Sequence, residues 1–179
     1  MEMDRYPLYR LLSRLRFGTW SLRGLASASN IGLGSAKTFL GWLEKWNLAE
    51  KKVDGRAHGY KMNLSSPLGR HIKILFTLGE LNLCGFLDEI LNYYVQSITL
   101  YGSAARGEDD EKSDIDILVI TRHPMRILNL KSIKRLPREL SIVSYGLSEW
   151  KKKSVADKIF YDRVIADGIQ LYGHKPMVR

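Results

Sequence analysis

The first third of the chain places its hydrophobic residues with the period of a helix. In residues 5–16 they recur every three or four positions, with arginines on the remaining face. The same spacing returns in residues 21–28 and 33–46, and the polar segment 29–32 suits a tight turn between two helices. The pattern therefore predicts three short helices.

Two stretches that alternate in the manner of strands follow these helices. They cover residues 48–53 and 58–64 and are joined by the sequence DGRA. An Asp-Gly pair between strand-like runs favours a β-hairpin, because glycine adopts the positive φ that such turns require. The sequence SSP at 65–67 then breaks the pattern, so we place the end of a first domain at residue 66.

Three helices followed by a hairpin is an order that resembles the winged helix-turn-helix family, along LASASNIGLGSAKTFLGWLEKWNLAEKKVDGRAHGYKMNL. The resemblance implies that the third helix meets the major groove or the phosphates of double-stranded DNA. The residues it implies for DNA contact are Ser35, Lys37, Thr38 and Lys45, with Arg56 on the wing. Alternatively, these residues form only the solvated face of a helix that buries Ala36, Phe39, Leu40, Leu43 and Trp46.

A largely apolar segment, residues 67–95, connects this part of the chain to the next. It predicts one or two helices, with Gly79 and Gly85 as interruptions. The single Cys84 lies in the apolar run LNLCGFLDEI and is expected to fill core space. After this segment, SITLY at 97–101 is typical of a short strand.

The most specific chemistry follows this strand. The sequence GSAARG at 102–107 suits a turn into a helix whose first backbone N–H groups can meet a phosphate. Asp114 and Asp116 then open an apolar strand-like run. Residues two apart on a strand share a face, so both carboxylates can converge on one hard cation or on a pair. Without a cation or hydrogen-bond donors, ionising both would be costly.

The combination GSAARGEDDEKSDIDILVI resembles the nucleotidyltransferase superfamily that includes DNA polymerase beta, especially its minimal single-domain members. The terminal DRVIADGIQLYG is similar to the closing helix and tail of that group, so the resemblance runs from about residue 80 to the end. It implies an α/β (α+β) nucleotidyltransferase fold with a mixed sheet, preceded here by the small winged-helix domain. The resemblance implies that Gly102 and Ser103 hold the β- and γ-phosphates of a nucleoside triphosphate. It implies that Asp114 and Asp116 ligate Mg²⁺ or Mn²⁺. It also implies that Arg106 and Ser113 order the phosphate loop.

The sequence departs from that superfamily at its third acid. Active members normally carry a further carboxylate on a later strand, as a metal ligand or as the base for the attacking hydroxyl. In LPRELSIVSY that position aligns with Ser141, and Glu139, two residues upstream, is the substitute if the strand begins that early. Residues 122–138 contain six Lys and Arg residues and no acid. This run indicates either a surface that binds the phosphates of a nucleotide or nucleic acid, or a solvated basic helix face.

Composition narrows the class of protein. With 45% hydrophobic and 26% charged residues, the 179-residue chain is expected to fold. No run approaches the ~18 apolar residues of a membrane span, and the charged start is unlike a secretory signal, so we expect a cytoplasmic protein without membrane contact. Of the net charge of +9, residues 1–66 carry +6, which favours a polyanionic partner.

These observations predict three segments: a winged helix at 1–66, a connecting helical segment at 67–95 and a nucleotidyltransferase-like domain at 96–179. The predicted reaction transfers a nucleoside monophosphate from a triphosphate, with ATP as the expected substrate, to an unidentified acceptor. One alternative is a non-catalytic transcription regulator that responds to a nucleotide. The other is an antitoxin-like protein that binds a helical protein partner, and a homodimer is a further expectation.

Overall fold

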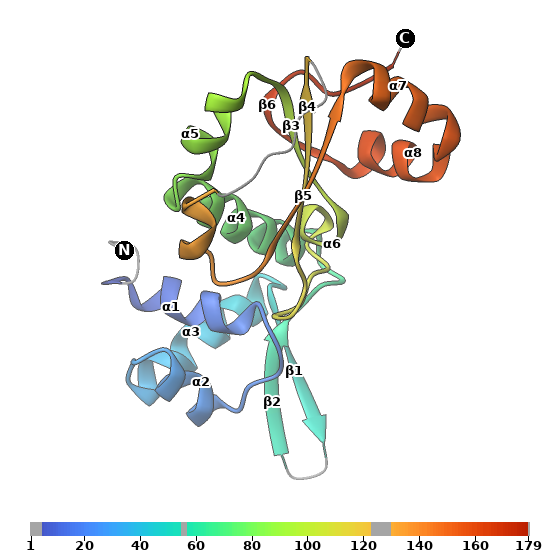
Figure 1. Cartoon of the computed structure of the whole chain (residues 1–179). Coiled ribbons are helices and arrows are strands. Elements are labelled where there is room, and N and C mark those ends of the chain that lie inside the picture. The colour runs from blue at the N-terminus through green and yellow to red at the C-terminus, as the bar shows by residue number, and fades with distance from the viewer. Residues whose placement is uncertain (1–4, 55–56, 123–129, 179) are drawn as a thin grey trace. The chain divides into compact units, whose positions relative to one another are not determined.

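The chain divides into two compact units. The computed structural model describes residues 5–54, 57–122 and 130–178. The first unit is Met1–Lys73 and the second is Ile74–Arg179 (Figure 1). The boundary expected before Pro67 coincides with the start of helix α4 (Pro67–Leu83), and the units divide within this helix. Nowhere in the described ranges is a helix long and apolar enough to cross a membrane.

The first unit has the winged helix-turn-helix arrangement. Its elements are α1 (Pro7–Leu15), α2 (Leu22–Ala28), α3 (Leu33–Lys45), β1 (Ala49–Asp54) and β2 (Ala57–Met62), and the two strands pair antiparallel (Figure 1). The Ser21 hydroxyl accepts a hydrogen bond from the Gly24 amide and thereby starts α2. Buried leucines of all three helices, including Leu11, Leu25 and Leu40, form one core.

The predicted buried face of α3 is right for Ala36, Leu40 and Leu43 and wrong for Trp46, which is 70% exposed. The spacing placed Trp46 one turn beyond Leu43, but the helix ends at Lys45. Asn47 then turns the chain with a φ of +57°, and Leu48 enters the core where the indole was expected. The exposed indole follows from this early helix end.

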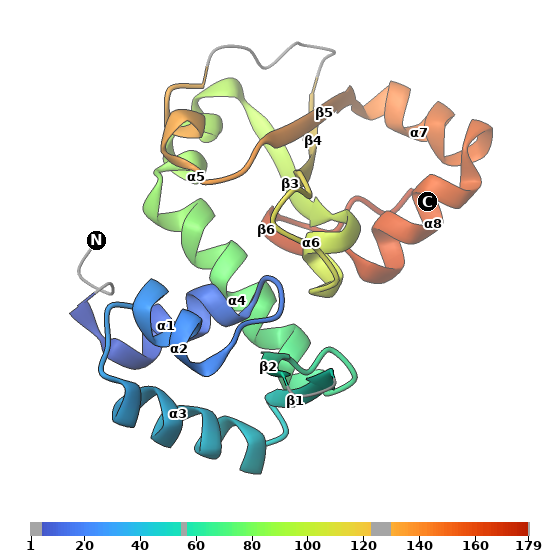
Figure 2. The ribbon, with the colours of Figure 1, turned by 90° about the horizontal axis from the view of Figure 1, so that it is seen from below.

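The second unit is built on a mixed four-stranded sheet in the order β5-β4-β3-β6. The strands are β3 (Val95–Tyr101), β4 (Ile115–Thr121), β5 (Leu140–Gly146) and β6 (Ile169–Gly173). Strand β3 runs antiparallel to β4 and β6, whereas β4 and β5 are parallel. One face packs on α4 and α5 (Phe86–Ile90), and the other packs on α7 (Leu147–Ala156) and α8 (Lys158–Asp167) (Figure 2).

Strand β4 divides its side chains between these two faces. Ile115 and Ile117 join the core with α4 and α5, whereas Leu118 and Ile120 pack with Trp150 of α7. Side chains alternate along a strand, so Asp116 lies on the same face as Leu118. The acidic start of β4 therefore belongs to the face covered by α7 and α8.

In the connecting segment, the predicted interruption at Gly79 is wrong, whereas the break at Gly85 and the burial of Cys84 are confirmed. Helix α4 continues through Gly79, because a glycine within a helix costs only about 1 kcal/mol and neighbouring Leu81 is fully buried. The predicted break at Gly85 is right, since its φ of +81° separates α4 from α5. Cys84 is buried, as expected for a core residue, and its thiol donates a hydrogen bond to the Leu81 carbonyl.

Candidate active site

The end of β3 brings a glycine against an acid. Gly102 begins the short helix α6 (Gly102–Arg106) with a φ of +74°, in the left-handed region that residues with side chains rarely adopt. Tyr101 pairs with Asp116 across β3 and β4. A Cβ atom added at Gly102 would lie 2.2 Å from Asp116 Oδ2, which is closer than atoms approach. The missing side chain therefore leaves room for the carboxylate, beside the half-buried Ser103.

The two predicted metal ligands affect each other electrostatically. Asp116 is half-buried and Asp114 is exposed. Burial raises the pKa of the Asp116 carboxyl, and the charge of Asp114 raises it further. Burial, followed by the charges of Asp116 and Tyr145, raises the pKa of the neighbouring Tyr101 to about 12. Asp116 thus occupies a partly desolvated position, where the negative charge of the exposed Asp114 repels that of its carboxylate.

Strand β5 places Ser141 beside Asp116, because these residues are partners in the parallel ladder. Glu139, just before the strand, accepts a hydrogen bond from the Ile115 amide through its backbone carbonyl at 2.9 Å, and its side chain is exposed. Within the described part of the chain, no three His, Cys, Asp or Glu side chains form a group that could hold a metal ion. Glu139 does not join the two aspartates as a third ligand in this arrangement.

The loop from Gly107 to Asp114 is ordered by its own polar side chains. The Ser113 hydroxyl donates to Asp110 Oδ1 at 2.8 Å and accepts from the Asp110 amide at 2.9 Å. The guanidinium of Arg106 bonds Glu108 at 2.7 Å and lies 3.8 Å from Asp167 of α8. Both residues, expected to order a phosphate loop, thus contact acids of the protein.

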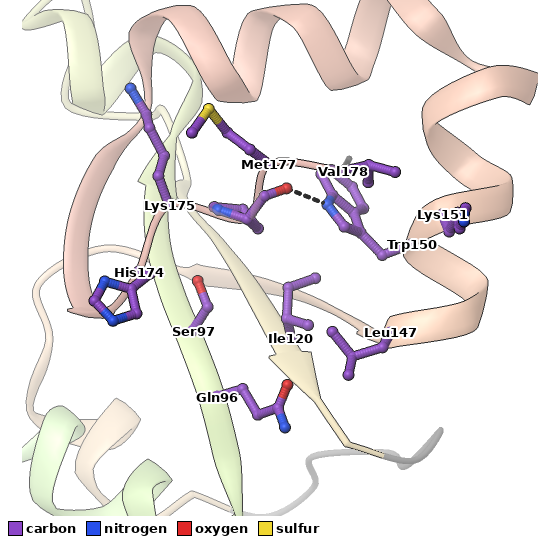
Figure 3. A pocket seen from close by; sticks show the side chains of 11 residues that line it. Gln96, Ser97, Ile120, Leu147, Trp150, Lys151, His174, Lys175, Met177 and Val178 are labelled. Carbon is purple, nitrogen blue, oxygen red and sulfur yellow. Dashed lines mark hydrogen bonds between the residues drawn. The ribbon is translucent and has the colours of Figure 1, made fainter.

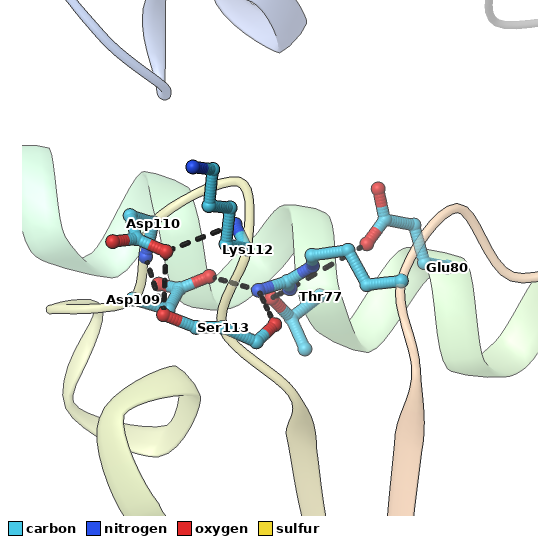
Figure 4. A network of polar contacts seen from close by, with 7 residues as sticks. Thr77, Glu80, Asp109, Asp110, Lys112 and Ser113 are labelled. Carbon is cyan, nitrogen blue, oxygen red and sulfur yellow. Dashed lines mark hydrogen bonds and ion pairs between the residues drawn. The ribbon is translucent and has the colours of Figure 1, made fainter.

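Arg138 is a residue whose role the sequence concealed. It belongs to the basic run at residues 122–138, which is interpreted from the sequence as a phosphate-binding surface or a solvated face. Its side chain, however, is only 3% exposed. Its guanidinium bonds Asp109 Oδ2 at 2.6 Å within a polar network (Figure 4). Neither interpretation holds for Arg138, whereas Arg122 and Lys134 of the same run are exposed. Arg126 of that run lies outside the described residues.

The paired aspartates suit a hard divalent cation. Mg²⁺ prefers oxygen ligands and is usually bound through one or two carboxylates together with substrate phosphates and water. Asp114 and Asp116 supply such a pair. Burial and, after it, the charge of Asp114 raise the pKa of Asp116, and a bound cation would offset the cost of ionising this carboxyl. The space beside the Gly102 backbone is filled by the Asp116 carboxylate, so the absence of a side chain at Gly102 lets this carboxylate lie against the start of α6. The donor set therefore fits Mg²⁺ or Mn²⁺ carrying a nucleotide.

A pocket of about 510 Å³ lies at the opposite ends of the same strands, lined by Ser97 of β3 and Ile120 of β4 (Figure 3). The buried Trp150 donates its indole N–H to the Pro176 carbonyl at 2.7 Å, which holds the C-terminal tail along this pocket. Gly102 and Asp116 lie at the other ends of β3 and β4. The pocket is thus separate from the paired carboxylates.

The residues expected to contact DNA lie in the first unit. Ser35, Lys37, Thr38 and Lys45 are all exposed on α3. The hydroxyl of Thr38 donates to the Gly34 carbonyl at 3.1 Å. Arg56 lies outside the described residues. The same helix exposes Trp42, whose side chain is 52% accessible.

Residues 83–166, which include the Gly102 turn and both aspartates, match the family of nucleotidyltransferase domains. Two proteins of Methanocaldococcus jannaschii, each named "Putative protein adenylyltransferase", are 33% identical to this chain over 76 residues. The match covers 38% of this chain and 78% of each relative. A solved winged helix-turn-helix DNA-binding domain, a homodimer from a possible ArsR-family transcriptional regulator of Mycobacterium bovis, aligns at 19% identity. Its TM-score is 0.38, and the alignment covers 43% of this chain and 70% of that one. Because the match to the archaeal proteins spans most of their length, this chain belongs to the nucleotidyltransferase domain family.

Proposed function

We propose that the second unit transfers a nucleoside monophosphate from a nucleoside triphosphate to an acceptor hydroxyl. The observation that carries this proposal is the convergence of the Asp116 carboxylate on the backbone of Gly102, with Asp114 close enough to raise the pKa of Asp116. A carboxylate pair that lies against the backbone at the start of α6 can hold a metal-bound triphosphate next to that backbone. This arrangement matches the requirement of phosphoryl-type transfer for positioning and charge compensation.

In the proposed reaction, Asp114 and Asp116 hold the divalent cation, and Gly102 and Ser103 lie along the phosphates. The bound cation would offset charge on the triphosphate and on its leaving group. The acceptor oxygen bonds to the α-phosphorus, the bond from that phosphorus to the bridging oxygen breaks, and pyrophosphate leaves. Glu139, exposed just before β5, is the proposed acceptor of the hydroxyl proton.

The relatives indicate which donor and acceptor to test first. The two archaeal proteins are named for adenylyl transfer to protein, so we propose ATP as the donor and a protein hydroxyl as the acceptor. The experiment incubates the chain with Mg²⁺, α-³²P-labelled ATP and an extract of its host cells. We expect labelled protein together with released pyrophosphate.

Matched variants make this experiment decisive. Asp114→Asn and Asp116→Asn should each lower labelling by at least about 10- to 100-fold, the loss typical of groups that merely support a metal ligand. Glu111→Gln is the control, because Glu111 is an exposed acid of the same loop. Equal labelling by the native chain and the two aspartate variants would remove the enzymatic proposal.

A second candidate is a regulator that binds a nucleotide without turnover. The observation in its favour is the Asp116–Ser141 pairing, because Ser141 is the residue that the resemblance to the superfamily aligns with the third acid of active members. Calorimetry separates the two candidates. Binding of Mg²⁺-ATP without labelled product or pyrophosphate across extracts favours the regulator. Co-purification of a helical protein from host cells would favour the partner-binding version.

We also propose that the first unit binds double-stranded DNA through α3. The support is an exposed helix face that carries Lys37, Lys45 and two hydroxyl side chains on a unit with net positive charge. Binding of the full chain to random-sequence duplex DNA would be measured at several salt concentrations. A salt-independent affinity, or no binding at 50 mM salt, would contradict this proposal.

A further inference from the structure

A buried arginine joins three separate segments of the second unit next to the paired aspartates. Arg138 precedes β5, and one of its terminal nitrogens, Nη1, bonds Asp109 in the loop before β4 at 2.6 Å. The other, Nη2, donates to the Thr77 hydroxyl of α4 at 3.0 Å and lies 3.9 Å from Glu80 Oε2 (Figure 4). The Asp109 side chain is 1% exposed, so this ion pair is shielded from water.

The same arginine reaches the residue beside the first aspartate. Nη1 of Arg138 donates to the Ser113 carbonyl at 3.4 Å, and Ser113 immediately precedes Asp114. On the other side of Asp114, the Ile115 amide donates to the Glu139 carbonyl at 2.9 Å, and Glu139 immediately follows Arg138. The backbone on both sides of Asp114 is thus held by Arg138 and Glu139, the two residues that precede β5.

The exposed Asp114 therefore owes its place to contacts made by its neighbours. We propose that Arg138 is a positioning residue that keeps the Asp114 carboxylate aligned with that of Asp116, an inference that rests on the function proposed above. Arg138 acts through Asp109 and Ser113 and does not touch the nucleotide. The planar guanidinium is required because its two terminal nitrogens reach Asp109 and Thr77 at once, which a lysine ammonium cannot reproduce in that geometry.

The test uses the full chain with three variants. Arg138→Lys keeps the positive charge but loses the two terminal nitrogens that bind Asp109 and Thr77 at the same time. Asp109→Asn combined with Arg138→Met removes the Arg138–Asp109 ion pair without leaving either of these two charges buried alone, and only the more distant Glu80 carboxylate, 3.9 Å from the guanidinium, loses a neighbouring cation. Arg135→Lys is the matched control, because Arg135 is an exposed arginine three residues upstream. Circular dichroism confirms that each variant is folded before the two readouts below are compared.

The first readout is hydrogen exchange at the amides of residues 113–116, which needs no metal. We expect faster exchange in Arg138→Lys and in the double variant than in the native chain and Arg135→Lys. The second readout is Mn²⁺ affinity by electron paramagnetic resonance in the presence of a non-hydrolysable ATP analogue. We expect a ~10- to 100-fold loss in both Arg138 variants, the range found for groups that orient metal ligands.

The outcomes separate this inference from the proposed function. Exchange and Mn²⁺ affinity that match the native chain in both Arg138 variants would overturn the positioning role. Faster exchange throughout the second unit, rather than in residues 113–116, would also overturn it, because Arg138 would then be a general structural residue. If Asp116→Asn binds Mn²⁺ as well as the native chain does, the proposed metal site is wrong, and hydrogen exchange still decides the role of Arg138.

Discussion

Replacing Gly102 by alanine tests the contact on which the candidate site depends. The substitution has two separable costs. A φ of +74° is unfavourable for any residue with a Cβ, by about 1–2 kcal/mol. The new Cβ would also lie 2.2 Å from Asp116 Oδ2, and such overpacking typically costs about 1–3 kcal/mol. We therefore expect Gly102→Ala to lower the free energy of unfolding by about 2–5 kcal/mol.

Gly85 provides the matched control. Its φ of +81° resembles that of Gly102, it lies in the same unit, and a Cβ there would meet nothing within 4 Å. Gly85→Ala should therefore show the backbone cost alone, about 1–2 kcal/mol. Urea unfolding followed by circular dichroism measures both variants in the transition of the second unit.

A double-mutant cycle tests whether the loss of stability beyond the backbone cost comes from the contact between the new Cβ and Asp116. In an Asp116→Ala background the carboxylate is gone and only the Cβ of residue 116, 3.3 Å from the added Cβ, remains, so Gly102→Ala should cost little more than Gly85→Ala. If Gly102→Ala and Gly85→Ala are equally destabilising in the native background, Asp116 does not lie against Gly102. The geometry proposed for the site would then be wrong.

Other properties of the chain give further predictions. Because its pKa is raised in the folded state, Asp116 destabilises the fold as pH rises, so Asp116→Asn should unfold at higher urea than the native chain at pH 7, and the difference should vanish below about pH 4. Mg²⁺ with ATP should raise the Tm of the native chain but not that of Asp116→Asn, and EDTA should reverse the rise. Trp150→Phe loses the hydrogen bond to Pro176 and buried volume, so urea unfolding should show a loss of about 1–3 kcal/mol. If Lys37 and Lys45 contact phosphates, alanine at either position should reduce the slope of log affinity against log salt by about 1.

The local sequence pattern is enough to predict most helices and strands of the fold. The three N-terminal helices, the hairpin and the strands around the two aspartates all lie where hydrophobic periodicity and turn residues indicated. Two predictions are wrong for different reasons, the first because of tertiary packing and the second because of a local turn. Helix α4 runs through Gly79 because its neighbours are buried, and Trp46 is exposed because Asn47 turns the chain before another helical turn can form.

Only those parts of the candidate site that are close together in the sequence could be predicted from the sequence. The placement of Gly102 before two alternating acids is a short-range pattern, and the structure brings Gly102 and Asp116 together. The burial of Arg138 was not predictable, because its partners Asp109 and Thr77 are 29 and 61 residues away in the sequence. Asp109 lies in an acidic run, GEDDEKSD, and no local pattern in this run distinguishes the acid that the fold buries against Arg138.

A crystal structure with Mn²⁺ and a non-hydrolysable ATP analogue tests the central claim most directly. We expect an anomalous manganese peak bonded to carboxylate oxygens of both Asp114 and Asp116, at about 2.0–2.2 Å, with the triphosphate lying over Gly102. Manganese and triphosphate bound elsewhere, or the two carboxylates facing away from each other in the complex, would contradict the account.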